Sequence, residues 1–257
     1  MLKISVVGLG FGMNLHHAIE AGKDGLLFTI CSIVLTLLVG WGLGKWFKND
    51  NKISFLISSG TAICGGSAIA AISPIVNADE KQMSVALGTI FILNSLALLI
   101  FPAIGHGLDM TQQQFGLWCA IAIHDTSSVV GAAARYGQEA LVIATTIKLE
   151  RALWIIPLSL LTVFFVKGAN KKNNIPYFIG LFILAMCLST YLPQFKNEYS
   201  LIVQGAKKGL TITLFLIGAG LSLDTIKAVG VKPFLQGIIL WILICLFSLA
   251  AIIYTYH

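Results

Sequence analysis

Residues 53–77, ISFLISSGTAICGGSAIAAISPIVN, are long enough and apolar enough to cross a lipid bilayer. The centre of this segment, however, is rich in small and polar residues, and Pro74 follows near its end. The paired glycines at 65 and 66 favour local unwinding, which leaves backbone N–H and C=O groups without helical partners. At membrane depth such groups are tolerated only where they are buried in protein or line a cavity. The segment therefore predicts an interrupted membrane helix, a feature of binding sites in secondary transporters.

The composition predicts an all-α polytopic membrane protein that forms a single transmembrane domain over residues 1–257. Of the 257 residues, 57% are hydrophobic and 11% are charged, whereas soluble domains carry about 25% charged residues. The net charge of +6 comes from short basic clusters between apolar runs, so the expected partner is the lipid bilayer and not nucleic acid. The five cysteines lie inside apolar runs without metal-ligand spacing, so we expect no disulfide, metal site or cofactor.

Apolar runs bounded by polar residues predict about nine transmembrane spans. The basic clusters Lys45–Lys52 and Lys167–Lys172 fall on one side, and the positive-inside rule places that side and the N-terminus in the cytoplasm. If residues 53–77 form a hairpin instead of a crossing, the topology after them inverts. The expected spans are 2–15, 25–46, 53–77, 83–105, 115–134, 139–166, 175–193, 207–222 and 234–256.

Two segments resemble each other and suggest an internal repeat. Residues 10–30 and 218–238 align without gaps and share six identical residues in 21 positions. Because seven spans separate them, the two copies would run in opposite directions, as inverted repeats of secondary transporters do. The alternative is that glycine-rich membrane helices resemble one another by composition alone.

Residues 115–137, FGLWCAIAIHDTSSVVGAAARYG, place two ionisable residues near the middle of an apolar span. An intramembrane ionisable residue is costly and indicates a function inside the protein or in a water-filled cavity. We expect His124, Asp125 and Ser127 to take part in coupling to an ion, either Na⁺ or H⁺. The alternative is a histidine–aspartate pair that only satisfies itself against neighbouring backbone.

Residues 139–166 carry two basic side chains about ten residues into an apolar run. Lys148 and Arg151 are three residues apart and share a helix face, whereas Glu150 lies on another. An arginine fork and a lysine ammonium both suit an oxyanion. A half-helix that starts near Gly66–Ser67 would aim further N–H donors at the same anion. The alternative is a structural salt-bridge network of Asp125, Glu150, Lys148 and Arg151.

Three motifs resemble the sulfate exporter family of bacterial inner-membrane proteins. They are GTAICGGSAIAAISPIV at 60–76, FGLWCAIAIHDTSSVVGAA at 115–133 and TTIKLERALWIIP at 145–157. The resemblance implies a multi-pass secondary transporter of sulfate or a sulfonate, with the discontinuous helices and inverted-repeat architecture of bile-acid sodium symporters and cation/proton antiporters. The residues that match the family's motifs are Thr61, Cys64, Gly65, Ser67, His124, Lys148 and Arg151.

The chain departs from the family's usual pattern at three points. Asp125 stands where glutamate is usual, and Glu150 stands where threonine is usual. The chain also begins at what resembles a later helix of the family, so two or three N-terminal helices are missing. This third departure raises the alternative of a shortened form that assembles as a homo-oligomer.

Secondary active transport of a small anion, bound between broken helices near the membrane midplane, is therefore the leading hypothesis. A sodium- or proton-coupled transporter of another organic solute, or a structural or sensory membrane protein, remains as an alternative. We do not expect an enzyme, because no activating motif surrounds the combination of Cys64, His124 and Asp125. The chain contains no Walker motif, which excludes ATP-driven transport by this chain.

Overall fold

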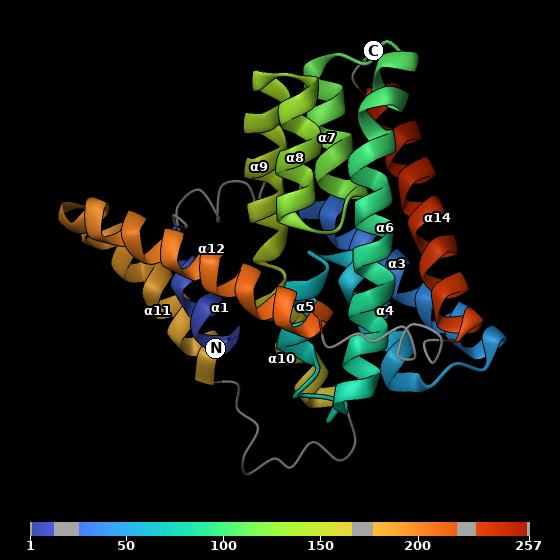
Figure 1. Cartoon of the computed structure of the whole chain (residues 1–257), viewed down its shortest axis with the longest axis horizontal. Coiled ribbons are helices and arrows are strands. Elements are labelled where there is room, and N and C mark those ends of the chain that lie inside the picture. The colour runs from blue at the N-terminus through green and yellow to red at the C-terminus, as the bar shows by residue number, and fades with distance from the viewer. Residues whose placement is uncertain (1, 13–25, 166–176, 220–229, 256–257) are drawn as a thin grey trace.

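The structure is a computed structural model that describes residues 2–12, 26–165, 177–219 and 230–255. Within these ranges all the regular elements are helices, so the all-α fold is confirmed there (Figure 1). Their bounds are α1 Leu2–Gly10, α3 Leu26–Phe47, α4 Asn51–Ala62, α5 Gly66–Ile72, α6 Glu80–Gly107, α7 Gln112–Ala122, α8 Thr126–Tyr136, α9 Gln138–Ala152, α10 Ile155–Phe165, α11 Tyr177–Tyr191, a 3₁₀ turn Pro193–Phe195, α12 Lys196–Ala219 and α14 Val231–Thr255.

Three helices of the described ranges are long and apolar enough to cross a membrane: α3, α6 and α14. They correspond to the expected spans 25–46, 83–105 and 234–256. Helix α12 begins at Lys196, well before the expected start at residue 207, and the expected first span is described only as far as Phe11–Gly12. These helices support a membrane protein fold. Helix α11 lies within the expected span 175–193, whereas the spans expected at 53–77, 115–134 and 139–166 take different forms.

The expected crossing at 53–77 is wrong, because helices α4 and α5 form a hairpin (hairpin 1) that returns to its starting end. Lys52 Nζ donates to Asn77 O at 2.6 Å, and Gln82 Nε2 donates to Asp50 Oδ1 at 3.2 Å, so both ends of the segment lie together. Helix α4 has 12 residues and is about 18 Å long, little more than half of a hydrocarbon core of about 30 Å. Hairpin 1 therefore reaches only to mid-depth (Figure 1).

Local chemistry explains where hairpin 1 begins and turns. The Asp50 carboxylate caps α4 by accepting from the N–H groups of Lys52 and Ile53. The chain reverses at Gly65, whose φ of +65° and ψ of −122° favour glycine. The serines of α4 are tolerated inside the protein because they bond within the helix, as Ser58 Oγ does to Ser54 O at 2.6 Å.

Helices α7 and α8 form a second hairpin (hairpin 2) from the opposite end, so the expected crossing at 115–134 is also wrong. Gln112 Oε1 accepts from the N–H of Glu139 at 3.0 Å, which ties the start of α7 to the residues that follow α8. The rings of Phe115 and Tyr136 stack with centroids 3.8 Å apart. Figure 1 shows hairpin 1 in the lower half of the molecule and hairpin 2 in the upper half.

The expected span 139–166 is interrupted between α9 and α10. Leu153 and Trp154 form a turn that bonds back to Glu150 O and Arg151 O. Pro157 lies in the first turn of α10 and has no N–H to continue the α9 ladder, and its ring would clash with the carbonyl of Leu153 in a continuous helix. The break places the end of α9 at the depth where the hairpins meet.

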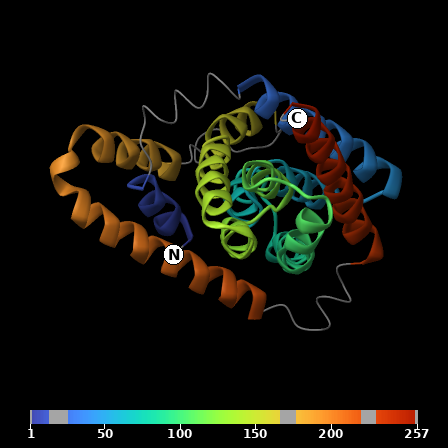
Figure 2. The same ribbon diagram turned by 90° about the horizontal axis from the view of Figure 1, so that it is seen from above.

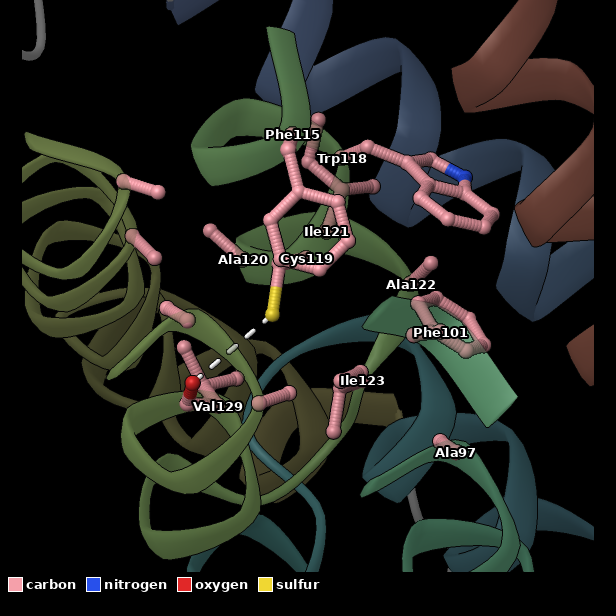
Figure 3. Packing of buried hydrophobic residues seen from close by; sticks show 14 of the residues in the cluster. Ala97, Phe101, Phe115, Trp118, Cys119, Ala120, Ile121, Ala122, Ile123 and Val129 are labelled. Carbon is pink, nitrogen blue, oxygen red and sulfur yellow. Dashed lines mark hydrogen bonds between the residues drawn. The ribbon is translucent and has the colours of Figure 1, made fainter. Parts of the chain in front are cut away.

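Each hairpin has its own apolar core, and helices α6 and α14 contribute to both. The core around hairpin 1 includes fully buried Leu56, Ile69 and Leu87. The core around hairpin 2 includes Phe101 and Trp118, whose rings stack with centroids 4.2 Å apart. Figure 3 shows this second core, in which the Cys119 thiol of α7 donates to a carbonyl of α8 at 3.7 Å.

Helix α14 ties the two hairpins to one support. Near its start, Gln236 Nε2 donates to Ser54 Oγ of hairpin 1 at 2.8 Å and to Gly40 O of α3 at 3.0 Å. Further along, Trp241 Nε1 donates to Ala122 O of hairpin 2 at 3.1 Å. Helices α3 and α14 lie on one side of the hairpins in Figure 2, and α1, α11 and α12 lie on the other.

Helices α1, α11 and α12 pack mainly on one another. Small residues permit this, since Gly8 of α1 lies against Ala206 of α12, and Ser189 Oγ of α11 donates to Phe11 O at 2.7 Å. The proposed repeat of 10–30 and 218–238 falls mostly on residues 13–25 and 220–229, which lie outside the described ranges. The inverted repeat therefore stays a prediction.

Candidate functional site

The turns of the two hairpins meet inside the protein. We call residues 62–66 tip 1 and residues 122–126 tip 2. A side-chain carbon added at Gly65 would lie 3.3 Å from both the carbonyl carbon and Cβ of His124, a contact so tight that the neighbouring atoms would have to move. The contact joins the two segments that the sequence singles out, and both are interrupted near their centres.

Lys148 of α9 joins the two tips directly. Its side chain is fully buried, and Nζ donates to Ile63 O at 3.3 Å, to Ala120 O at 3.2 Å and to Ile123 O at 2.7 Å. These carbonyls lie at the C-terminal ends of α4 and α7, where helices have unpaired acceptors and a partial negative charge. The ammonium therefore neutralises two half-helix ends at once.

Arg151 lies one turn further along α9 and holds the same tip 1 from another side. Its Nη2 donates to Ala62 O at 2.7 Å, and Nη1 donates to Ser32 Oγ of α3 at 3.3 Å. The Arg151 Nε has no hydrogen-bond partner among the described residues. Lys148 and Arg151 thus share a face of α9, as expected, and their hydrogen bonds go to backbone carbonyls and a hydroxyl.

His124 occupies tip 2 and is fully buried. Its backbone N–H donates to Asn94 Oδ1 of α6 at 3.0 Å. Within the described residues, both ring nitrogens of His124 lack a hydrogen-bond partner, and so does Asn94 Nδ2. The next residue, Asp125, is half-buried and accepts from the backbone N–H of Ser128 at 3.1 Å, which caps the first turn of α8.

The remaining predicted residues lie on or next to tip 1. Thr61 and Cys64 are buried, and Thr61 Oγ1 has no partner in the described part of the chain. Helix α5 begins at Gly66, where the sequence predicts a half-helix to start, and Ser67 is half-buried. The side chain of Ser127 lies outside the described residues, so its expected role in ion coupling stays a prediction.

Two residues at the tips were not in the predicted site: Ser32 and Asn94. A single polar residue in an apolar helix more often bonds to a neighbouring helix than to a ligand, so its type alone does not distinguish the two roles. Only the folded arrangement brings Asn94 next to His124.

The electrostatic balance of the tips is positive. To a first approximation the two C-terminal and two N-terminal half-helix ends cancel, since each carries roughly half a charge. The charged side chains that donate hydrogen bonds to the tips are the cations Lys148 and Arg151, and Asp125 of tip 2 interacts electrostatically with Lys148. Such a site favours an anionic ligand.

A comparison with known protein families gives one match. The model of a family described as conserved hypothetical protein 698 covers residues 1–237. The chain belongs to this family. Its relatives include a UPF0324 membrane protein from Bacteroides thetaiotaomicron, which is 61% identical over an alignment that covers 99% of this chain and 78% of the relative. A UPF0324 membrane protein from Porphyromonas gingivalis is 57% identical over 98% of this chain and 78% of its own length.

These relatives support the assignment as a membrane protein. A third relative, the UPF0324 membrane protein of Shewanella oneidensis, is 52% identical over 99% of this chain and 80% of its own length. No solved structure matches this chain significantly. The family membership and the apolar helices together establish a membrane protein, and the chemistry of the tips must carry any statement about its function.

Proposed function

We propose that this member of the family is a secondary active transporter of a small anion that binds where the two hairpin tips meet. The observation that carries the proposal is the contact of two half-depth hairpins from opposite ends, with Lys148 and Arg151 buried at that contact. Interrupted helices at mid-depth are a recurrent way to build solute sites in membranes. The positive balance of the tips supports an anion, with sulfate or a sulfonate as the first substrates to test.

The hairpins also favour one orientation in a bacterial inner membrane. Hairpin 1 returns to its starting end, so Lys81 lies on the same side as Lys48 and Lys52, not opposite them as a crossing would place it. The positive-inside rule then places this basic end in the cytoplasm. Coupling to Na⁺ or H⁺, which the experiment below addresses, and assembly as a homo-oligomer are further parts of the proposal.

Reconstitution tests the proposal. Purified protein in liposomes is given an outward or inward gradient of Na⁺ or H⁺, and uptake of radiolabelled sulfate is measured with sulfite, methanesulfonate and acetate as competitors. We expect gradient-dependent uptake of one oxyanion class, recovered chemically unchanged, which distinguishes transport from catalysis. Absence of flux for all these anions under both gradients would contradict the proposal.

A pair of arginine variants tests whether transport depends on the residues at the tips. Arg151→Gln removes the buried guanidinium, whereas Arg135→Gln removes an exposed one at the end of α8. The Arg151 guanidinium holds Ala62 O of tip 1 and places positive charge at the tips, and a hydrogen bond from a charged group contributes about 1.5–3 kcal/mol, so we expect the Arg151 variant to lose about tenfold or more in apparent affinity. The Arg135 variant should transport as the unmodified protein does. Equal transport by both variants would show that Arg151 does not contribute to the anion site.

A further inference from the structure

Asn94 lies at the tips although it belongs to an unbroken helix. It is 2% exposed in the middle of α6, and Ile90, one turn earlier, lies 3.2 Å from the position of a side-chain carbon at Gly65. The hydrogen bond from the His124 N–H to Asn94 Oδ1 places the amide against tip 2 as well. Asn94 is therefore a third contributor to the meeting point of the hairpins.

The hydrogen bond from His124 fixes the orientation of the Asn94 amide. A backbone N–H can donate only to the oxygen of an amide group, so the other end of the amide must be Nδ2. Nδ2 is a donor without acceptor capacity, and it has no partner among the residues that the structure describes. The fold thus holds an oriented, buried donor next to the two tips.

The His124 ring adds a second group of the same kind. It is fully buried, and a neutral imidazole offers one donor and one acceptor nitrogen, neither of which is bonded within the described ranges. A buried polar group without a partner is unfavourable, so two such side chains, joined through the hydrogen bond from the His124 backbone N–H to Asn94 Oδ1, indicate a ligand or ordered water. Asn94 can supply only a donor, which selects a ligand with acceptor atoms.

Lys148, one of the two cations at the tips, already has hydrogen-bond partners. All three hydrogen bonds that Lys148 makes go to the carbonyls of Ile63, Ala120 and Ile123, which equals the three donors of an ammonium. Its charge still acts on the site, but its donors are in use. Direct contacts to a ligand must then come mainly from other groups.

We propose that Asn94 Nδ2 and the His124 imidazole are the direct contacts to an oxygen of a bound oxyanion, while Lys148 supplies charge through the half-helix ends. This assignment rests on the proposed function. It makes Asn94 a specificity-determining residue, because Nδ2 can only donate and therefore requires an acceptor oxygen on the ligand. The substrate class is an anion with such an oxygen, such as sulfate, a sulfonate or a carboxylate.

Asn94→Asp is the decisive variant, because it keeps an oxygen for the His124 N–H and replaces only the donor. The melting temperature of purified protein is measured in detergent against sulfate, methanesulfonate and acetate, with chloride at matched ionic strength. A ligand that binds only the folded state raises the melting temperature. We expect Asn94→Asp to weaken binding about 10- to 100-fold, because it loses a hydrogen bond to a charged ligand and adds a like charge. Ser95→Ala, on the exposed face of the same helix, should bind as the unmodified protein does.

The unmodified protein provides a second measurement that does not depend on the stability of a variant. With ¹⁵N-asparagine labelling, titration with sulfate should shift the side-chain amide resonance that is absent in Asn94→Asp. If the unmodified protein binds sulfate while the variant binds it equally well, or the Asn94 amide resonance does not move, the assignment is wrong and the proposed function stands. If none of the three anions binds to or crosses the membrane with the unmodified protein, the proposed function fails and the assignment fails with it.

Discussion

Replacing Lys148 by methionine tests whether one ammonium holds both hairpin tips. The substitution keeps an unbranched apolar chain of similar length but removes the donors to three buried carbonyls. Each buried carbonyl left without a partner costs about 1–3 kcal/mol. The substitution also removes the desolvation cost of burying the ammonium, which offsets part of the summed cost of the three unpaired carbonyls. We therefore expect a net loss of about 3–5 kcal/mol, the range found when one member of a buried charged pair is removed.

The assay is thermal unfolding in detergent, followed by intrinsic tryptophan fluorescence. For a chain of this size, each kcal/mol shifts the melting temperature by about 2–4 °C, so Lys148→Met should melt roughly 6–20 °C lower. Lys81→Met is the matched control, because Lys81 is exposed in the first turn of α6. It should melt as the unmodified protein does.

The result that refutes this reasoning is specific. If Lys148→Met melts at the same temperature as Lys81→Met, the ammonium does not stabilise the half-helix ends. A higher melting temperature for Lys148→Met would mean that the desolvation cost of the buried cation exceeds its hydrogen bonds. In either case the lysine would have to be retained for a reason other than the stability of the tips.

Two further predictions concern the tips and the direction of the hairpins. Gly65→Ala forces a side chain into a φ of +65° and against Ile90, at a cost of about 1–3 kcal/mol, so its melting temperature should fall by roughly 2–12 °C. Gly66→Ala meets only ordinary contacts at 3.4 Å and should unfold as before, and equal melting of the two variants would contradict the close contact of the tips. In a background without native cysteines, Lys52→Cys and Lys81→Cys should react with an impermeant thiol reagent from one side of the membrane, and Gln138→Cys from the other. If the cysteines at positions 52 and 81 were labelled from opposite sides, residues 53–77 would cross the membrane and would not form a hairpin.

The sequence predicts the interruptions but not the direction in which the chain continues after them. Paired glycines at 65 and 66 and the two ionisable residues at 124 and 125 locate both turns. An apolar arm that crosses the bilayer and one that turns back have the same composition, because both are buried in the protein. The length of each arm is the useful distinction, since α4 and α7 have only 12 and 11 residues, about 18 Å and 16 Å.

The site is predictable in part for a similar reason. Buried charge predicts that Lys148 and Arg151 face the interior, and both do. Their partners are backbone carbonyls, which every residue carries, so no sequence pattern identifies them. The role of Asn94 cannot be predicted without the folded structure, because it depends on one hydrogen bond between residues that lie 30 positions apart in the sequence.

The bases of the two hairpins are closed by separate sets of residues, so each hairpin can be altered by mutation on its own. One base is closed by Asp50, Lys52 and Gln82, and the other by Gln112 together with the stacked rings of Phe115 and Tyr136. The two sets share no residue and lie at opposite ends of the molecule. A substitution in one set therefore loosens the base of one hairpin and leaves the base of the other intact. The two hairpins can thus be destabilised separately, although both lead to the same few atoms at the tips.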